Sequence, residues 1–224
     1  MMDSNLVYRA AVAIVPLVIA IVFHEVAHGW AARALGDPTA YEQRRLSFNP
    51  LRHVDPMGTI VVPLGLALAG APVFGWAKPV PVDSRRLREP RTGMMLVALA
   101  GPGMNLLLAL AASVLLGVLV GAGLAPDGFV GSMLVEFILV DVFIALFNLL
   151  PIPPFDGSHV LEGLLPRPLA RRYADLRQAG FALVILLVVV LPMVAPRANL
   201  VGRVVLPPAR WLAGLFFGLA HAVG

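Results

Sequence analysis

Long apolar runs dominate the chain, and each is about the length needed to cross a lipid bilayer. A helical span needs roughly 20 consecutive apolar residues. The clear candidate spans are residues 6–32, 94–123, 130–150 and 178–195. The C-terminal stretch is interrupted by Pro207, Pro208 and Arg210, and it is either a further span starting near Val204 or a helix lying at the membrane surface. The pattern predicts an all-α polytopic membrane protein with about five to six transmembrane helices.

One apolar segment, residues 58–74, is too short for a regular span and is rich in Gly and Pro. Basic side chains gather in the loops on both sides of it, and loops rich in Lys and Arg face the cytoplasm. Both ends of 58–74 are therefore expected on the same side of the membrane. This arrangement favours a re-entrant segment over a short true span.

The composition narrows the class of protein. Hydrophobic residues make up 59% of the chain and charged residues only 13%, whereas soluble domains carry about 25% charged residues. This excludes a soluble globular enzyme and a disordered chain. The 17 basic and 13 acidic residues give a net charge of +4, and the basic residues are too scattered to predict a nucleic-acid partner. No cysteine is present, so neither disulfides nor thiolate metal ligands are available.

The first apolar run contains the sequence His24-Glu25-Val26-Ala27-His28. Two His residues at positions i and i+4 lie on one face of a helix. That spacing allows both imidazoles to bind one Zn²⁺ ion, and Glu25 between them is placed to act as a general base toward water. Ionisable groups inside a membrane are costly, so they indicate function by default.

A third metal ligand is expected from a separate segment, residues 148–157, which reads Asn-Leu-Leu-Pro-Ile-Pro-Pro-Phe-Asp-Gly. Three Pro residues within four positions cannot continue a helix, so the third long span is expected to unwind there. Asp156 would then lie where a new helix begins, and Gly157 would permit close backbone approach. Asp156 is either an N-cap or a metal ligand, and the His pair favours the ligand.

Several other polar residues have open roles. Asn148 either holds the substrate or its developing oxyanion, or satisfies carbonyl groups freed by the Pro break. Asp141 either supports a group of the active site from behind or faces a water-filled cavity. Asn105 fits helix packing with an interhelical hydrogen bond better than a contact to the substrate. His53 fits a loop His bonded to backbone better than a ligand, and His159 suits either a contact to the site or polar packing.

These motifs resemble those of the site-2 protease family of zinc intramembrane metalloproteases. HEVAH at 24–28 matches the zinc motif, and NLLPIPPFDG at 148–157 matches the second signature of the family. GPGMN at 101–105 is similar to the glycine-to-asparagine motif that precedes the second core span. The resemblance runs from about residue 10 to 165, in the family's order, without a PDZ-like insertion.

The resemblance implies that His24, His28 and Asp156 bind one Zn²⁺ ion and that Glu25 is the catalytic acid and base. Asn148 would position the substrate or oxyanion, and a re-entrant β-hairpin would fall within about 40 to 90. An exposed strand of that hairpin could hold an unwound substrate.

Taken together, residues 1–224 are expected to form a single membrane-embedded metalloprotease domain with a core at 6–165 and accessory C-terminal helices at 178–224. The expected activity is hydrolysis of a peptide bond in or near a transmembrane segment of a membrane protein. The expected location is a bacterial or archaeal cell membrane, with the active site toward the cytoplasm. The alternatives are a metal-binding transporter and an inactive scaffold that use the same His and Asp residues.

Overall fold

The computed structural model describes residues 2–70, 73–195, 199 and 201–224. Within these residues the chain is mainly helical and contains no β-strand, which confirms the predicted all-α class. The elements in chain order are α1 (Met2–Ala34), α2 (Thr39–Glu42), η1 (Pro50–His53), η2 (Pro56–Val61), α3 (Val62–Leu68), η3 (Ser84–Arg86), α4 (Pro90–Gly121), α5 (Phe129–Asn148), α6 (Asp156–Leu164), α7 (Arg167–Asp175), η4 (Leu176–Ala179), α8 (Gly180–Val184), η5 (Ile185–Val190), α9 (Leu191–Val194), η7 (Val201–Val205) and α10 (Leu206–Val223).

Five helical stretches among the described residues are long and apolar enough to cross a membrane. They are Leu6–Ala34, Pro90–Gly121, Phe129–Asn148, Arg167–Val194 and Val201–Val223. The four clear candidate spans are thus confirmed as membrane-length helices. The C-terminal stretch is also long enough, because Pro207 and Pro208 lie in the first turn of α10, where a missing backbone N–H does not cost a helical hydrogen bond.

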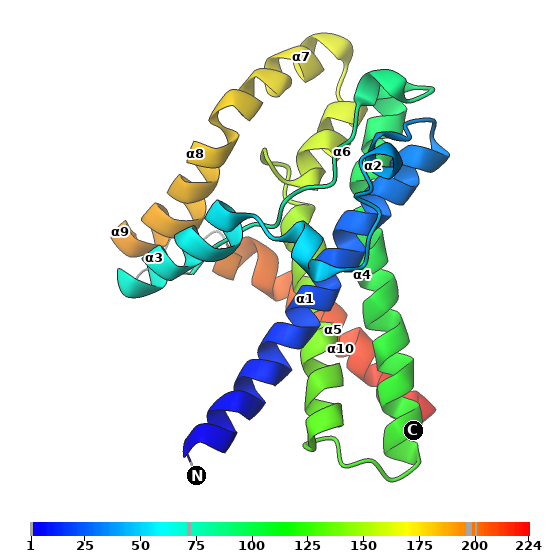
Figure 1. Cartoon of the computed structure of the whole chain (residues 1–224), viewed down its shortest axis with the longest axis vertical. Helices are drawn as coiled ribbons and strands as arrows, with labels where there is room; N and C mark the ends of the chain where they lie inside the picture. Colours follow the sequence, from blue (N-terminus) through cyan, green and yellow to red (C-terminus); the bar gives the residue numbers. More distant parts are fainter. Residues whose placement is uncertain (1, 71–72, 196–198, 200) are drawn as a thin grey trace.

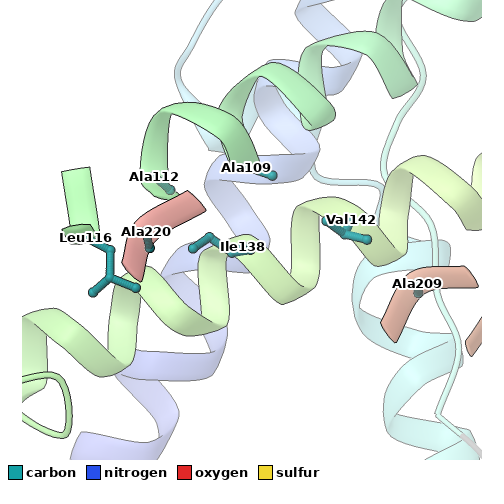
Figure 2. Packing of buried hydrophobic residues seen from close by; sticks show 7 residues of the cluster. All are labelled: Ala109, Ala112, Leu116, Ile138, Val142, Ala209 and Ala220. Atoms are coloured by element: carbon teal, nitrogen blue, oxygen red, sulfur yellow. The ribbon is translucent and has the colours of Figure 1, made fainter. Parts of the chain in front are cut away.

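A bundle of α1, α4, α5 and α10 forms the centre of the molecule, and α6 packs against α4. Ile138 and Val142 of α5 are fully buried against α4 and α10 (Figure 2). Four alanines line the same contact: Ala109, Ala112, Ala209 and Ala220. Small side chains allow helix backbones to approach closely, and this packing stabilises membrane bundles.

The end of α5 forms the break that the sequence predicts. The helix ends at Asn148, residues 149–155 are not helical, and α6 begins at Asp156. The buried side chains of Leu150 and Phe155 anchor this linker against Val184 and Val205. The packing fixes where α6 starts, and therefore where Asp156 lies.

The predicted β-hairpin between residues 40 and 90 is not formed in the described part of the chain. Pro56 opens the helical turn η2, which continues into α3. The returning arm, residues 73–83, is extended and not helical. It pairs with η2 only locally: Trp76 N–H donates to Gly58 O at 3.1 Å, and Thr59 Oγ1 donates to Trp76 O at 2.9 Å. The re-entrant path of 58–74 stays a prediction.

Asp37, beyond the end of α1, anchors the start of the loop that follows the extended arm. The side chain is fully buried. One carboxylate oxygen accepts hydrogen bonds from the backbone N–H and the hydroxyl of Thr39, and the other accepts from Asp83 N–H at 2.7 Å. Asp37 thus joins the C-terminal end of α1 to the segment that returns toward α4.

Replacing Asp37 with Ala should destabilise the protein, because partly buried donors of Thr39 and Asp83 lose their acceptor. An unsatisfied buried donor costs about 1–3 kcal/mol. The midpoint of thermal unfolding in detergent should fall in this variant. Asp127→Ala, in the exposed loop before α5, is the matched control and should leave the midpoint unchanged. Equal midpoints for both variants would contradict the anchoring role of Asp37.

Candidate metal centre

Two imidazoles from α1 lie side by side inside the bundle. The side chains of His24 and His28 are only 5% and 9% exposed. Their Nε2 atoms are 3.1 Å apart, and the two rings meet nearly edge to face. The i, i+4 spacing of the sequence therefore produces the predicted pair on one helix face.

The carboxylate of Asp156 reaches the same point from the first turn of α6. Its Oδ2 atom is 3.1 Å from His24 Nε2 and 3.3 Å from His28 Nε2. The following residue must be Gly for this position to exist, since a Cβ atom on Gly157 would lie 2.2 Å from Leu149 O. The Pro break and Gly157 together bring Asp156 to the His pair.

The three atoms form a nearly equilateral triangle that fits a metal ion. Its sides are 3.1, 3.1 and 3.3 Å. Ligand bonds of roughly 2.0–2.1 Å in a tetrahedral arrangement place neighbouring ligand atoms roughly 3.3 Å apart. Two imidazole nitrogens and one carboxylate oxygen are also the donor types of catalytic zinc sites, which leave a fourth position open.

The outer nitrogens of both rings have hydrogen-bond partners in α4. His28 Nδ1 donates to Val97 O at 2.7 Å, and His24 Nδ1 lies 2.6 Å from Asn105 Oδ1. Gly101 lies between these partners, and a Cβ atom there would be 2.4 Å from His28 Nε2. The α4 backbone therefore packs directly on the candidate ligands. From the sequence, helix packing and an interhelical hydrogen bond were expected here, but not their contact with the His pair.

Glu25, on the neighbouring face of α1, is half-buried and contacts the extended arm. Its Oε2 atom accepts a hydrogen bond from Val80 N–H at 2.8 Å. Val80 lies between Pro79 and Pro81, which have no N–H, so it provides the only backbone donor of this tripeptide. This contact could not be predicted from the sequence, because every residue other than Pro carries the same backbone N–H donor.

The extended arm offers no free strand edge at this point. Lys78 N–H donates to His53 O at 2.8 Å, and Arg45 Nη2 donates to the carbonyl groups of Lys78 and Pro79 at 2.9 and 3.3 Å. With Val80 N–H bonded to Glu25, these backbone groups are already engaged. The expected exposed strand that would receive a substrate is therefore absent from residues 78–80.

Asn148 and His53 make their hydrogen bonds away from the three candidate metal ligands. Asn148 Nδ2 donates to Ile144 O of its own helix at 3.0 Å, and His53 Nε2 donates to Ser47 O at 2.7 Å. His53 thus has the backbone-bonded role that the sequence favoured. Asn148 has no hydrogen bond to the three candidate ligands in the described residues.

His159, one turn after Asp156, has a polar partner from a neighbouring element. Arg177 Nη2 donates to His159 Nδ1 at 3.1 Å, and Arg177 also forms an ion pair with Glu162. Burial and the Arg177 guanidinium lower the pKa of His159 to about 4. The ring is therefore neutral at pH 7, which suits the packing role considered from the sequence.

Comparison with known proteins gives similarities that agree with this site. Residues 122–190 match the family model described as Peptidase family M50. The chain is 36% identical over 195 residues to the "Putative zinc metalloprotease YwhC" of Bacillus subtilis, an alignment that covers 84% of this chain and 86% of that protein.

Two mycobacterial proteins are also similar. The "Putative zinc metalloprotease Rip2" of Mycolicibacterium smegmatis is 33% identical over 168 residues, covering 74% of this chain and 62% of that protein. The protein of the same name from Mycobacterium tuberculosis (strain ATCC 25618 / H37Rv) is 32% identical over 212 residues, covering 91% of this chain and 69% of its own length. No solved structure gives a significant match.

Proposed function

The chain belongs to the site-2 protease family, peptidase family M50, and from this premise we propose that it is a zinc-dependent intramembrane endopeptidase. The proposed reaction is hydrolysis of a peptide bond within or beside a transmembrane segment of another membrane protein. The observation that supports it most directly is the triangle of His24, His28 and Asp156 inside a bundle of membrane-length helices.

In this proposal His24 Nε2, His28 Nε2 and Asp156 Oδ2 hold one Zn²⁺ ion per chain. When bound, the ion lowers the pKa of a coordinated water to about 7 and polarises the scissile carbonyl group. The burial of the two imidazoles limits access to bulk water, and low local dielectric strengthens electrostatic stabilisation. The donor set and the triangle's dimensions support this assignment.

Glu25 is proposed to move the proton. Its carboxylate takes a proton from the attacking water, the water oxygen bonds to the carbonyl carbon, and Glu25 returns the proton to the nitrogen as the C–N bond breaks. The bond from Val80 N–H uses only Oε2 of Glu25, so Oε1 is left for this transfer. Asn148 is proposed to turn from Ile144 O and hold the substrate or its oxyanion.

The proposed location is a cell membrane, with the site toward the cytoplasmic side. Helix α2, in the Arg-rich loop after α1, and the Arg-rich helix α7 lie near one end of the molecule (Figure 1). The loop before α5 lies at the opposite end (Figure 1). Loops rich in Arg and Lys mark the cytoplasmic side. Residues 1–224 are proposed to act as one domain, and the packing of α10 on α4 and α5 supports this.

Metal analysis of purified protein beside the Asp156→Ala variant tests the proposed site. The wild-type protein should contain about one zinc per chain, and the variant should lose most of it, because catalytic zinc sites depend on three protein ligands. Asp175→Ala, which removes an exposed carboxylate at the end of α7, should retain the metal.

Zinc retained by Asp156→Ala would remove Asp156 from the ligand set. Zinc-free wild-type protein would instead favour an inactive scaffold. A third outcome, zinc flux into liposomes without proteolysis, would favour a transporter and contradict the proposed enzyme.

A further inference from the structure

We propose that Asn105 and Asp141 are positioning residues, which fix the His24 ring so that Nε2 presents its lone pair to the metal. This inference rests on the proposed function. The three side chains form one buried chain of contacts across three helices. His24 Nδ1 lies 2.6 Å from Asn105 Oδ1, and Asn105 Nδ2 donates to Asp141 Oδ1 at 2.5 Å. Asn105 and Asp141 are both fully buried.

The surroundings of Asn105 determine which way its amide points. Its Nδ2 group lies 3.2 Å from Ala20 O and 2.5 Å from Asp141 Oδ1. A backbone carbonyl oxygen is only an acceptor, so the amide atom that faces Ala20 O must be the donor nitrogen. Exchanging the amide's oxygen and nitrogen would set an oxygen against both of these oxygens. The amide nitrogen therefore faces Ala20 and Asp141, and the amide oxygen faces His24.

This orientation decides the tautomer of His24. Because Asn105 presents an oxygen to it, His24 Nδ1 must carry a hydrogen and donate. In the neutral ring the lone pair then belongs to Nε2, the atom that faces Asp156 and His28. A hydrogen-bonded outer nitrogen fixes the ring and its tautomer in metal sites.

Among the residues that the structure describes, no other partner explains the position of Asp141. Its Oδ2 atom is buried and makes no hydrogen bond with the described residues. An ionisable side chain within a membrane helix is costly and indicates function. The bond to Asn105 Nδ2 is the one hydrogen bond of the Asp141 side chain in the described residues, so we assign Asp141 the role of holding this amide.

The two candidate His ligands differ in how they are supported. His28 Nδ1 donates to Val97 O, a backbone group that side-chain substitutions do not remove. His24 depends on the side chain of Asn105, which is held in turn by Asp141 and by Ala20 O. Substitutions behind His24 should therefore weaken metal binding stepwise, whereas the support of His28 stays intact.

The test measures zinc affinity of the purified full chain by competition with a chromogenic chelator in detergent. Asn105→Leu should weaken zinc binding about 10–100-fold, the range for groups that support metal ligands. Asp141→Leu should weaken it less, because Ala20 O still holds the amide. Asp141→Asn should bind zinc nearly as the wild type does, since its amide oxygen can accept from Asn105 Nδ2.

A second readout separates positioning from general stability. In zinc-loaded protein labelled with ¹⁵N-histidine, the His24 Nδ1–H signal should be protected from solvent exchange, and Asn105→Leu should remove this protection. Ser113→Ala is the matched control, because it deletes another buried polar contact of α4, to Phe216 O, away from His24. It should leave zinc affinity and the His24 signal unchanged.

The outcomes are distinct. Wild-type zinc affinity in both Asn105→Leu and Asp141→Leu would overturn this inference but leave the proposed function standing. An equal loss in Asp141→Asn and Asp141→Leu would also overturn it, because the conservative variant keeps the acceptor. Wild-type protein that binds no zinc would overturn the proposed function, and this inference with it.

Discussion

Replacing Glu25 with Gln should abolish peptide hydrolysis while leaving the fold and the bound zinc intact. Gln has nearly the same shape and keeps an oxygen that can accept from Val80 N–H. It cannot take a proton from water at neutral pH. General acid and base catalysis contributes about 10²–10⁴-fold, so a loss of at least this size is expected.

The measurement does not require a known substrate. Membranes of cells that express the wild-type or the Glu25→Gln protein can be compared by sequencing new peptide N-termini within or beside transmembrane segments. Such N-termini should appear with the wild type and be absent with Glu25→Gln, at equal protein and zinc content. The same N-termini in both membranes would remove Glu25 from the mechanism.

Replacing Gly101 with Ala should eliminate zinc binding. The added Cβ atom would lie 2.4 Å from His28 Nε2 and 2.7 Å from His24 Cε1, closer than atoms tolerate. Neither ring can move away without leaving the triangle. The expected loss of zinc affinity is at least about 100-fold, at or beyond the upper end of the range for groups that support metal ligands.

Gly103→Ala is the matched control for this experiment. It lies on the same helix two residues later, and a Cβ atom there meets no other atom within 4 Å. Both substitutions change helix propensity equally, so a difference in zinc content measured by elemental analysis reports the contact with the His pair. Equal zinc content in the two variants would contradict the close packing of α4 on the candidate ligands.

The candidate metal ligands could be predicted because short sequence motifs identify them. The spacing of His24 and His28 fixes a shared helix face. The Pro residues before Asp156 fix a helix break, and the structure has α6 beginning there. These features depend on a few neighbouring residues, so no long-range contact is needed to infer them.

The support of the site could not be predicted in the same way. Val97 and Val80 contribute backbone groups that any residue would carry. The link from His24 to Asn105 spans 81 residues, and the sequence gives no rule for that distance. Asn105 was correctly assigned an interhelical hydrogen bond, but its partners became apparent only with the packing of α1, α4 and α5.

The segment at 56–68 shows a different reason why prediction from the sequence failed. The Gly and Pro content of 58–74 favoured a re-entrant segment over a short true span, and the family resemblance suggested a β-hairpin within about 40 to 90. Pro56 and Pro63 instead occupy the first positions of η2 and α3. A Pro at such a position is compatible with a helix start, so the same residues fit both structures until the returning arm is placed.

The distance along the chain between His24 and Asp156 has a consequence for the order of assembly. Their contact joins residues 132 positions apart. Closing so long a loop in an unfolded chain carries a large entropic cost, which grows with the logarithm of its length. The contacts of α1 with α4 and α5 hold these parts of the chain close together without the ion. We therefore expect the helix bundle to fold in the absence of zinc, unlike a zinc finger, whose polypeptide stays unfolded until the metal binds.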